Sequence, residues 1–247
     1  MASLNHNHHV SAILFSFFLV VGLLRVESSA AQSVTGTTGL FSTPTARVMP
    51  DKTVSAGFYF FPGALSNYSR DGLYDNGNFH ATLTFLPRLE VMFRYTRMLN
   101  LDAESRESIF MDRMMTARIL IFREGRHTPG LLIGFQDFGG TFGTTVNNHF
   151  GANYVVASKS LEMKMVFTDL SIGYAYDLEN DQSNTMSGIF AGLEFKTQKD
   201  APFSFIAEFD SHRLNAAVKL HFRRVQVMTG LMGMKYVSGG MSIQYPI

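Results

Sequence analysis

From about residue 53 to its last residue, the chain alternates apolar and polar residues with a period of two. Residues 79–85 (FHATLTF) and 89–95 (LEVMFRY) show the pattern, and it recurs along most of the remaining chain. Successive side chains of a β-strand point to opposite faces, so this period places each apolar set on one face of a strand. The pattern predicts about twelve strands and no long helix.

A long antiparallel sheet must hide its edges, either by closing into a barrel or by folding into a sandwich. Charged residues make up 17% of the chain, whereas about 25% is usual for soluble domains. The chain also holds 23 Phe and 21 Gly but no second long apolar run. Apolar residues spread over alternate positions of many strands are typical of a transmembrane barrel. We therefore expect an all-β, antiparallel, up-and-down transmembrane barrel over residues 53–247, with a secreted periplasmic β-sandwich binding module as the alternative.

The connections between the expected strands differ in length from one end to the other. Long polar connections follow the first, third, fifth and seventh strands, at residues 62–78, 100–107, 139–149 and 177–185. The connections that follow the even strands are shorter. Alternate connections of a meander lie at opposite ends, so one end is expected to carry the long loops, as in outer-membrane barrels.

The parity of the strands also assigns side chains to the two faces of the barrel. Apolar residues such as Leu83, Phe93, Ile119, Leu193 and Phe205 are expected to face lipid. Charged residues on or near the other parity are expected to point into the lumen, either as a salt-bridge network or as a lining that contacts sugars. This lumenal set comprises Glu90, Arg94, Arg118, Glu194, Glu208, Lys219, His221 and Arg224.

The N-terminal region does not follow the strand pattern. Residues 13–24 form an uncharged apolar run that is short for a membrane-spanning helix, which needs about 20 residues, and small residues follow at 28–31. We expect residues 1–31 to be a cleaved signal peptide, with a retained signal anchor as the alternative. Residues 32–52 contain Gly36, Gly39 and Pro44 and are expected to form a turn-rich periplasmic lead-in or a plug. We therefore expect the protein to be exported through this signal peptide and to lie in the outer membrane of a Gram-negative-type bacterium.

Few chemical functions are indicated by the sequence. The chain has no cysteine, which leaves no disulfides and no thiolate metal sites. Its net charge of +1 gives no reason to expect a nucleic acid partner. We find no set of residues at the spacing that a catalytic, cofactor or metal site requires, and we expect the protein not to be an enzyme.

Two stretches carry more specific patterns. Residues 35–51 read TGTTGLFSTPTARVMPD, and residues 112–141 read DRMMTARILIFREGRHTPGLLIGFQDFGGT, with YVVASK following at 154–159. Together they resemble the YjbH-like (GfcD-like) family of outer-membrane exopolysaccharide proteins over most of the chain beyond residue 31. The matching positions are Gly39, Thr43, Pro44, Ala46, Arg47, Gly134, Asp137, Gly140, Thr141, Tyr154 and Lys159.

The resemblance implies a β-barrel that assists the assembly or export of exopolysaccharide or capsule. The implied partners are outer-membrane lipid, polysaccharide and other secretion components. The residues alone equally allow a structural scaffold or a small nonspecific outer-membrane channel. A membrane-embedded enzyme is a further alternative, but no set of residues favours it.

Overall fold

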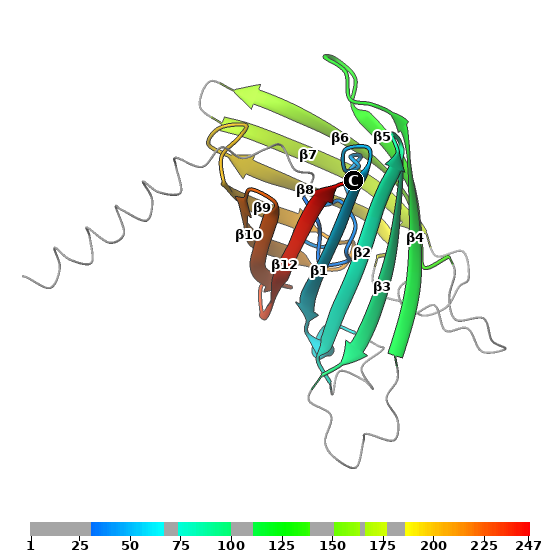
Figure 1. Ribbon diagram of the computed structural model, residues 1–247. Helices are drawn as coiled ribbons and strands as arrows, with labels where there is room; N and C mark the ends of the chain where they lie inside the picture. The colour runs from blue at the N-terminus through cyan, green and yellow to red at the C-terminus, as the bar shows by residue number, and fades with distance from the viewer. Residues whose placement is uncertain (1–30, 67–73, 100–110, 139–150, 164–165, 177–185) are drawn as a thin grey trace, which may run out of the picture.

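A computed structural model describes residues 31–66, 74–99, 111–138, 151–163, 166–176 and 186–247 of this chain (Figure 1). The expected signal peptide lies outside the described residues, apart from Ala31. The described part holds twelve strands. They are β1 (Thr53–Phe61), β2 (Asn76–Leu86), β3 (Leu89–Met98), β4 (Met111–Phe122), β5 (Gly130–Gln136), β6 (Ala152–Met163), β7 (Val166–Tyr176), β8 (Gly188–Lys196), β9 (Phe203–Phe209), β10 (Leu214–Phe222), β11 (Val225–Met232) and β12 (Tyr236–Pro246).

The strands form one closed barrel in which each strand pairs antiparallel with its neighbours in the sequence. The barrel closes where β1 pairs with β12, with Val54 opposite Tyr245 and Phe58 opposite Met241. Closure pairs both edges of the sheet, so no strand is left as an open edge. The predicted twelve-stranded antiparallel barrel is confirmed, and the alternative sandwich is wrong.

Aromatic side chains reinforce the pairing on the outer face of the first strands. Phe58 of β1 lies opposite Phe79 of β2, and their ring centroids are 4.8 Å apart. The ring of Phe79 lies 6.3 Å from that of Tyr95, which is its partner on β3. Such cross-strand aromatic pairs stabilise a sheet by roughly 0.2–1 kcal/mol each and help to fix its register.

The two ends of the barrel differ as the sequence predicts. At one end, which we call the long-loop end, the strands are joined by residues 62–75, 99–110, 137–151, 177–187, 210–213 and 233–235. At the other, which we call the short-turn end, the connections are residues 87–88, 123–129, 164–165, 197–202 and 223–224. Both the start of β1 and the end of β12 lie at the short-turn end.

The outer face of the barrel is apolar and the inner face is polar. Phe93, Ile119 and Phe205 are 46%, 40% and 59% exposed, whereas the inward-facing Thr82 and Ser204 are fully buried. Leu83 is also exposed on the outer face, and Leu193 is half-buried. The faces that parity assigned to these residues are therefore correct. Among the described residues, no helix is long and apolar enough to cross a membrane.

The apolar core lies inside the barrel, around a segment that precedes β1. We call residues 31–51 the lumenal segment. Its Leu40 and Phe41 pack with Tyr59 and Ile206 of the wall. Ala46 packs in a second cluster with wall residues that include Tyr154. The lumen is therefore filled in part by the chain itself.

Candidate functional site

A tight turn of the lumenal segment surrounds the carboxylate of Glu208. The backbone N–H groups of Phe41, Ser42 and Thr43 donate to this carboxylate at 3.1, 2.8 and 3.1 Å. The Thr43 hydroxyl donates to it at 2.8 Å, and the Ser42 hydroxyl also donates to it. Glu208 lies on β9 and is 3% exposed. Successive backbone N–H groups form a concave anion site, so the turn is built to hold a carboxylate of the wall.

Glu90 of β3 holds the lumenal segment at two further points. Its carboxylate accepts hydrogen bonds from the Thr38 backbone and hydroxyl at 3.0 and 2.5 Å, and from the Met49 backbone at 3.2 Å. Arg118 of β4 pairs with Glu90 at 2.5 Å, and both side chains are 0% exposed. Arg118 also donates to the Thr45 carbonyl at 2.6 Å. The two charges therefore compensate each other while both hold the same segment.

The remaining contacts of the segment come from other strands around the wall. The backbone N–H and carbonyl of Gln32 bond the Gln226 amide of β11, and the Thr82 hydroxyl of β2 donates to the Gly36 carbonyl. Lys219 of β10 donates to the Gly39 carbonyl, and the Ala46 N–H donates to Ser158 of β6. On the long-loop side of the segment lies a cavity of only 40 Å³, beside Val34, Thr35 and Arg94. The segment is thus bound to strands on most sides of the wall.

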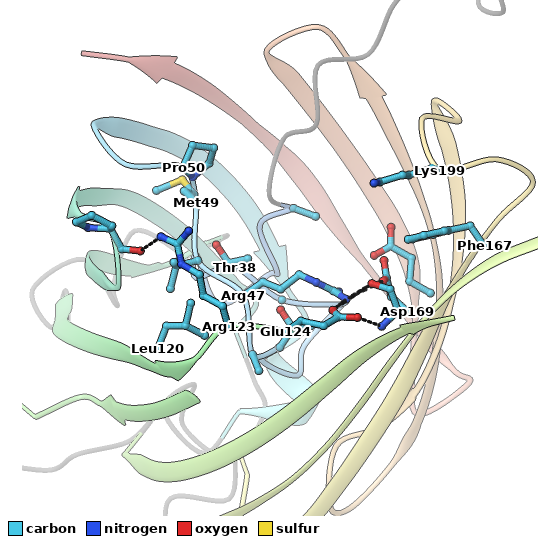
Figure 2. Close-up of a pocket in the computed structure, with 18 of the residues that line it drawn as sticks. Thr38, Arg47, Met49, Pro50, Leu120, Arg123, Glu124, Phe167, Asp169 and Lys199 are labelled. Carbon is cyan, nitrogen blue, oxygen red and sulfur yellow. Dashed lines mark hydrogen bonds and ion pairs between the residues drawn. The ribbon is translucent and has the colours of Figure 1, made fainter. Parts of the chain in front are cut away.

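A larger cavity of 620 Å³ opens at the short-turn end, and we call it the mouth cavity (Figure 2). The lumenal segment forms one wall of the cavity through Arg47 and Met49, and Leu120 of β4 also lines the cavity. The opposite wall comes from β7, β8 and the connections at that end. The lining residues with charged or aromatic side chains are Arg47, Asp51, Arg123, Glu124, Phe167, Asp169, Glu194, Lys196 and Lys199.

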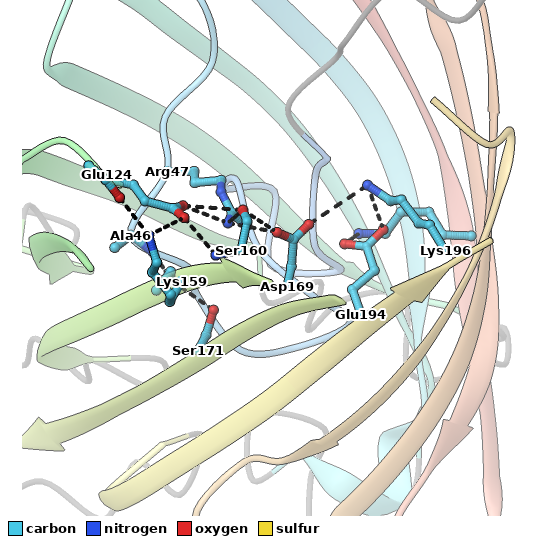
Figure 3. Close-up of polar contacts among 12 residues, drawn as sticks. Ala46, Arg47, Glu124, Lys159, Ser160, Asp169, Ser171, Glu194 and Lys196 are labelled. Atoms are coloured by element: carbon cyan, nitrogen blue, oxygen red, sulfur yellow. Dashed lines mark hydrogen bonds and ion pairs between the residues drawn. The ribbon is translucent and has the colours of Figure 1, made fainter. Parts of the chain in front are cut away.

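Alternating charges run along the wall of the mouth cavity (Figure 3). Arg47 bridges Glu124 at 3.1 Å and Asp169 at 2.7 Å. Lys196 lies 3.9 Å from Asp169 and 3.5 Å from Glu194. The row continues into the lumen, where Lys219 lies 3.7 Å from Glu194. Each carboxylate has a cationic neighbour, so the row is compensated charge by charge.

Glu124 ends this row in the connection between β4 and β5. Its carboxylate accepts the Ser160 backbone N–H at 2.7 Å and lies 3.3 Å from the Lys159 ammonium. Burial raises the pKa of this carboxyl, but the hydrogen bond from Ser160 and the charges of Arg47 and Lys159 outweigh that effect, and the pKa is lowered. The lowered pKa favours the ionised form of Glu124, which pairs with Arg47.

Seven of the eight residues expected in the lumen are buried inside the barrel. Arg224 is the exception and that prediction was wrong. It is exposed in the two-residue turn between β10 and β11, with its guanidinium 4.4 Å from the centre of the Tyr245 ring. The turn places Arg223 at φ 53°, so parity cannot be continued through it. The residues inside are Glu90, Arg94, Arg118, Glu194, Glu208, Lys219 and His221.

The motif positions divide between the lumenal segment and the wall. Gly39, Thr43, Pro44, Ala46 and Arg47 all belong to the segment, and Lys159 donates to the carbonyls of residues 125 and 126 at the short-turn end.

Two wall positions of the motif, Gly134 and Tyr154, lie against each other. Tyr154 accepts a hydrogen bond from Arg118 at 3.0 Å, and its ring covers Gly134, where a Cβ would collide with the ring. Asp137 is buried at the end of β5, with φ 59°. Gly140 and Thr141 lie outside the described residues.

Sequence reasoning named Arg47 and Glu194 but missed most of the other charged and aromatic residues of the mouth cavity. Glu124, Phe167, Asp169, Lys196 and Lys199 lie at strand ends or in connections, where alternation carries little information. The signal that the sequence offered was the charges on β7 and β8, because Asp169 and Glu194 lie opposite each other in the two strands.

The fold and the site define a twelve-stranded β-barrel protein whose residues 31–51 occupy part of its lumen. Residues 31–236 match the family described as "Exopolysaccharide biosynthesis protein YbjH". The chain belongs to this YjbH family.

Among curated proteins, the chain is similar to the "Uncharacterized lipoprotein YjbH" of Escherichia coli (strain K12). The identity is 28% over 135 residues, which are 53% of this chain and 17% of that protein. The chain therefore matches only about a sixth of the relative's length. Among solved structures, it resembles the outer membrane phospholipase (OMPLA) dimer of Salmonella typhi with bound calcium, at a TM-score of 0.41, 11% identity and coverage of 79% and 91%. The Escherichia coli outer membrane phospholipase A gives a TM-score of 0.35, 11% identity and coverage of 79% and 89%.

Proposed function

We propose that this protein is an outer-membrane barrel that assists the assembly or export of exopolysaccharide, and that its resting state is closed. The single observation that carries the closed state is the lumenal segment, held by Glu90 and Glu208 on different parts of the wall. Membership of the exopolysaccharide-related family supports the substrate class. A structural scaffold is compatible with a closed barrel, whereas a permanently open nonspecific channel is not.

The outer surface supports placement in a membrane. Large apolar side chains are exposed on strands all round the barrel, among them Phe93, Ile172, Ile189 and Phe205. The strands are 7 to 12 residues long, and about 9–11 tilted residues cross a bilayer. In bacterial barrels the short turns face the periplasm. By that rule the mouth cavity faces the periplasm.

An arginine placed in the middle of this apolar belt should destabilise the barrel. The Phe93→Arg variant is expected to lower the free energy of unfolding by about 2–4 kcal/mol, because the charge would lie near the middle of the bilayer. Unfolding by urea from lipid vesicles measures the change. Phe122→Arg is the matched control, since Phe122 ends β4 at the short-turn end, where the cost falls to about 0–1 kcal/mol. Equal costs at the two positions would contradict the proposed depth.

Deletion of the gene tests the role in exopolysaccharide production. We expect the polysaccharide outside the cell to fall in amount under conditions in which the gene is expressed. The wild-type gene on a plasmid should restore the amount. An unchanged amount and composition would refute the role in assembly or export, and the barrel would then be a scaffold for some other envelope process.

A further inference from the structure

The mouth cavity continues outward as a groove across the rim of the barrel. A second depression of 390 Å³ adjoins it and is lined by Arg126, Lys159 and Glu162. The two share Glu124, Ser160, Phe167 and Lys199 as lining residues. The volume of the mouth cavity, 620 Å³, falls within the range of about 300–1,000 Å³ that is usual for sites of small ligands. An extended molecule can therefore lie with one part in the cavity and the rest along the rim.

The charges of this groove divide into an inner set joined by ion pairs and an outer set of cations that have no ion-pair partner among the described residues. The inner carboxylates Glu124, Asp169 and Glu194 each lie within ion-pair distance of an arginine or lysine. The outer cations are exposed, and within the described part of the chain none of them has an ion-pair partner: Arg123, Arg126 and Lys199. Asp51 and Glu162 are the exposed carboxylates of the same groove. The charges left for a ligand are therefore cationic in excess.

Phe167 supplies an apolar surface in the same place. Its half-buried side chain lines both the cavity and the rim depression, and Figure 2 shows it beside Lys199. A sugar ring has an apolar face of C–H groups that packs against an aromatic ring, and hydroxyls that bond charged and hydroxyl groups at its edge. Ser160 and the carboxylates of the inner row supply such groups.

We infer that the mouth cavity and its rim form a binding site for a glycan that carries carboxylate groups. The ring of one sugar packs on Phe167, and the hydroxyls of that sugar bond the inner row. Carboxylates of the glycan pair with Lys199 and Arg123. This inference rests on the proposed function and deepens it, because it assigns the class of polysaccharide and the place where the barrel holds it.

Titration calorimetry of the purified protein in detergent micelles tests the site. The probes are oligogalacturonate, which carries carboxylates, and malto-oligosaccharide of equal length, which is neutral. We expect oligogalacturonate to bind more tightly, and added salt to weaken its binding because exposed charges are screened. Lys199→Gln and Arg123→Gln should each weaken it about two- to fivefold, as expected for an exposed ion pair.

Two further variants separate a specific site from general attraction of charge. Phe167→Ala should weaken binding about two- to tenfold through loss of packing on the ring. Lys235→Gln removes an exposed cation from the long-loop end and should leave binding unchanged. Heat-modifiable migration on gels verifies that each variant is folded.

The outcomes distinguish this inference from the proposed function. If neither oligosaccharide binds to the folded protein, the site is refuted, even where deletion of the gene lowers exopolysaccharide and the function stands. If both bind equally, or if Lys199→Gln and Lys235→Gln behave alike, the assignment to acidic glycans is wrong. If oligogalacturonate binds as expected while deletion leaves exopolysaccharide unchanged, the site stands and the proposed function fails.

Discussion

Replacing Glu90 by alanine is expected to lower the free energy of unfolding by about 3–5 kcal/mol. The change would leave the Arg118 guanidinium, which is 0% exposed, without the carboxylate that compensates its charge. It would also remove the acceptor for the backbone N–H groups of Thr38 and Met49, which are buried. Urea unfolding from lipid vesicles measures the loss. It can be followed by circular dichroism or by tyrosine fluorescence, since the chain has no tryptophan.

A double variant provides the control for this prediction. Glu90→Met combined with Arg118→Met removes both charges and keeps most of the volume, so it should cost less than Glu90→Ala alone. Glu162→Ala removes an exposed carboxylate from the end of β6 and should change the stability by less than about 0.5 kcal/mol. If Glu90→Ala cost no more than Glu162→Ala, the buried pair would not hold the segment as described.

Release of the lumenal segment is expected to turn a closed barrel into a conducting one. An eight-stranded barrel is filled by its own side chains, whereas barrels of 16–18 strands leave an aqueous channel. A barrel of twelve strands lies between these, so the space that the segment occupies is the space that water and ions would fill. Deletion of residues 32–49 should therefore produce discrete current steps in planar bilayers where the wild-type protein produces none.

A milder variant tests the same prediction if the deletion variant does not fold. Glu208→Ala removes the acceptor of the turn at residues 41–43 but keeps the apolar side chains of the segment. It is expected to give brief openings. Only variants that migrate as folded barrels on unheated gels should be scored. Equal currents from the wild-type protein, or silence from a folded deletion variant, would show that the segment does not close the lumen.

Alternation was sufficient to predict the wall of the barrel from the sequence. It placed Glu90, Glu208 and Lys219 inside because each lies between outward-facing apolar neighbours on a single strand. It gave no information on what these side chains bind. Glu208 and its partner Thr43 are 165 residues apart in sequence, and no local pattern connects residues at such a separation.

The mouth cavity could not be predicted for a different reason. Phe167 lies near the start of β7, and Glu124 and Lys199 lie in connections, where side chains are no longer held to alternate faces. Arg224 shows the same effect, since the parity of β11 continued one residue back into the turn places its side chain on the wrong side. Fold prediction from a period of two is reliable within strands and ends where the strands end.

The lumenal segment has a consequence for the order in which the molecule assembles. Gln32 bonds Gln226 at a separation of 194 residues, and β1 pairs with β12, so the first and last parts of the chain meet twice. Contacts at such separations form late, because the entropy of closing a long loop opposes them. Closing the seam before the segment had entered would require a hydrogen-bonded turn to pass through the end of an already closed barrel. We therefore expect capture of the segment and closure of the β1–β12 seam to occur together, late in the assembly of the barrel.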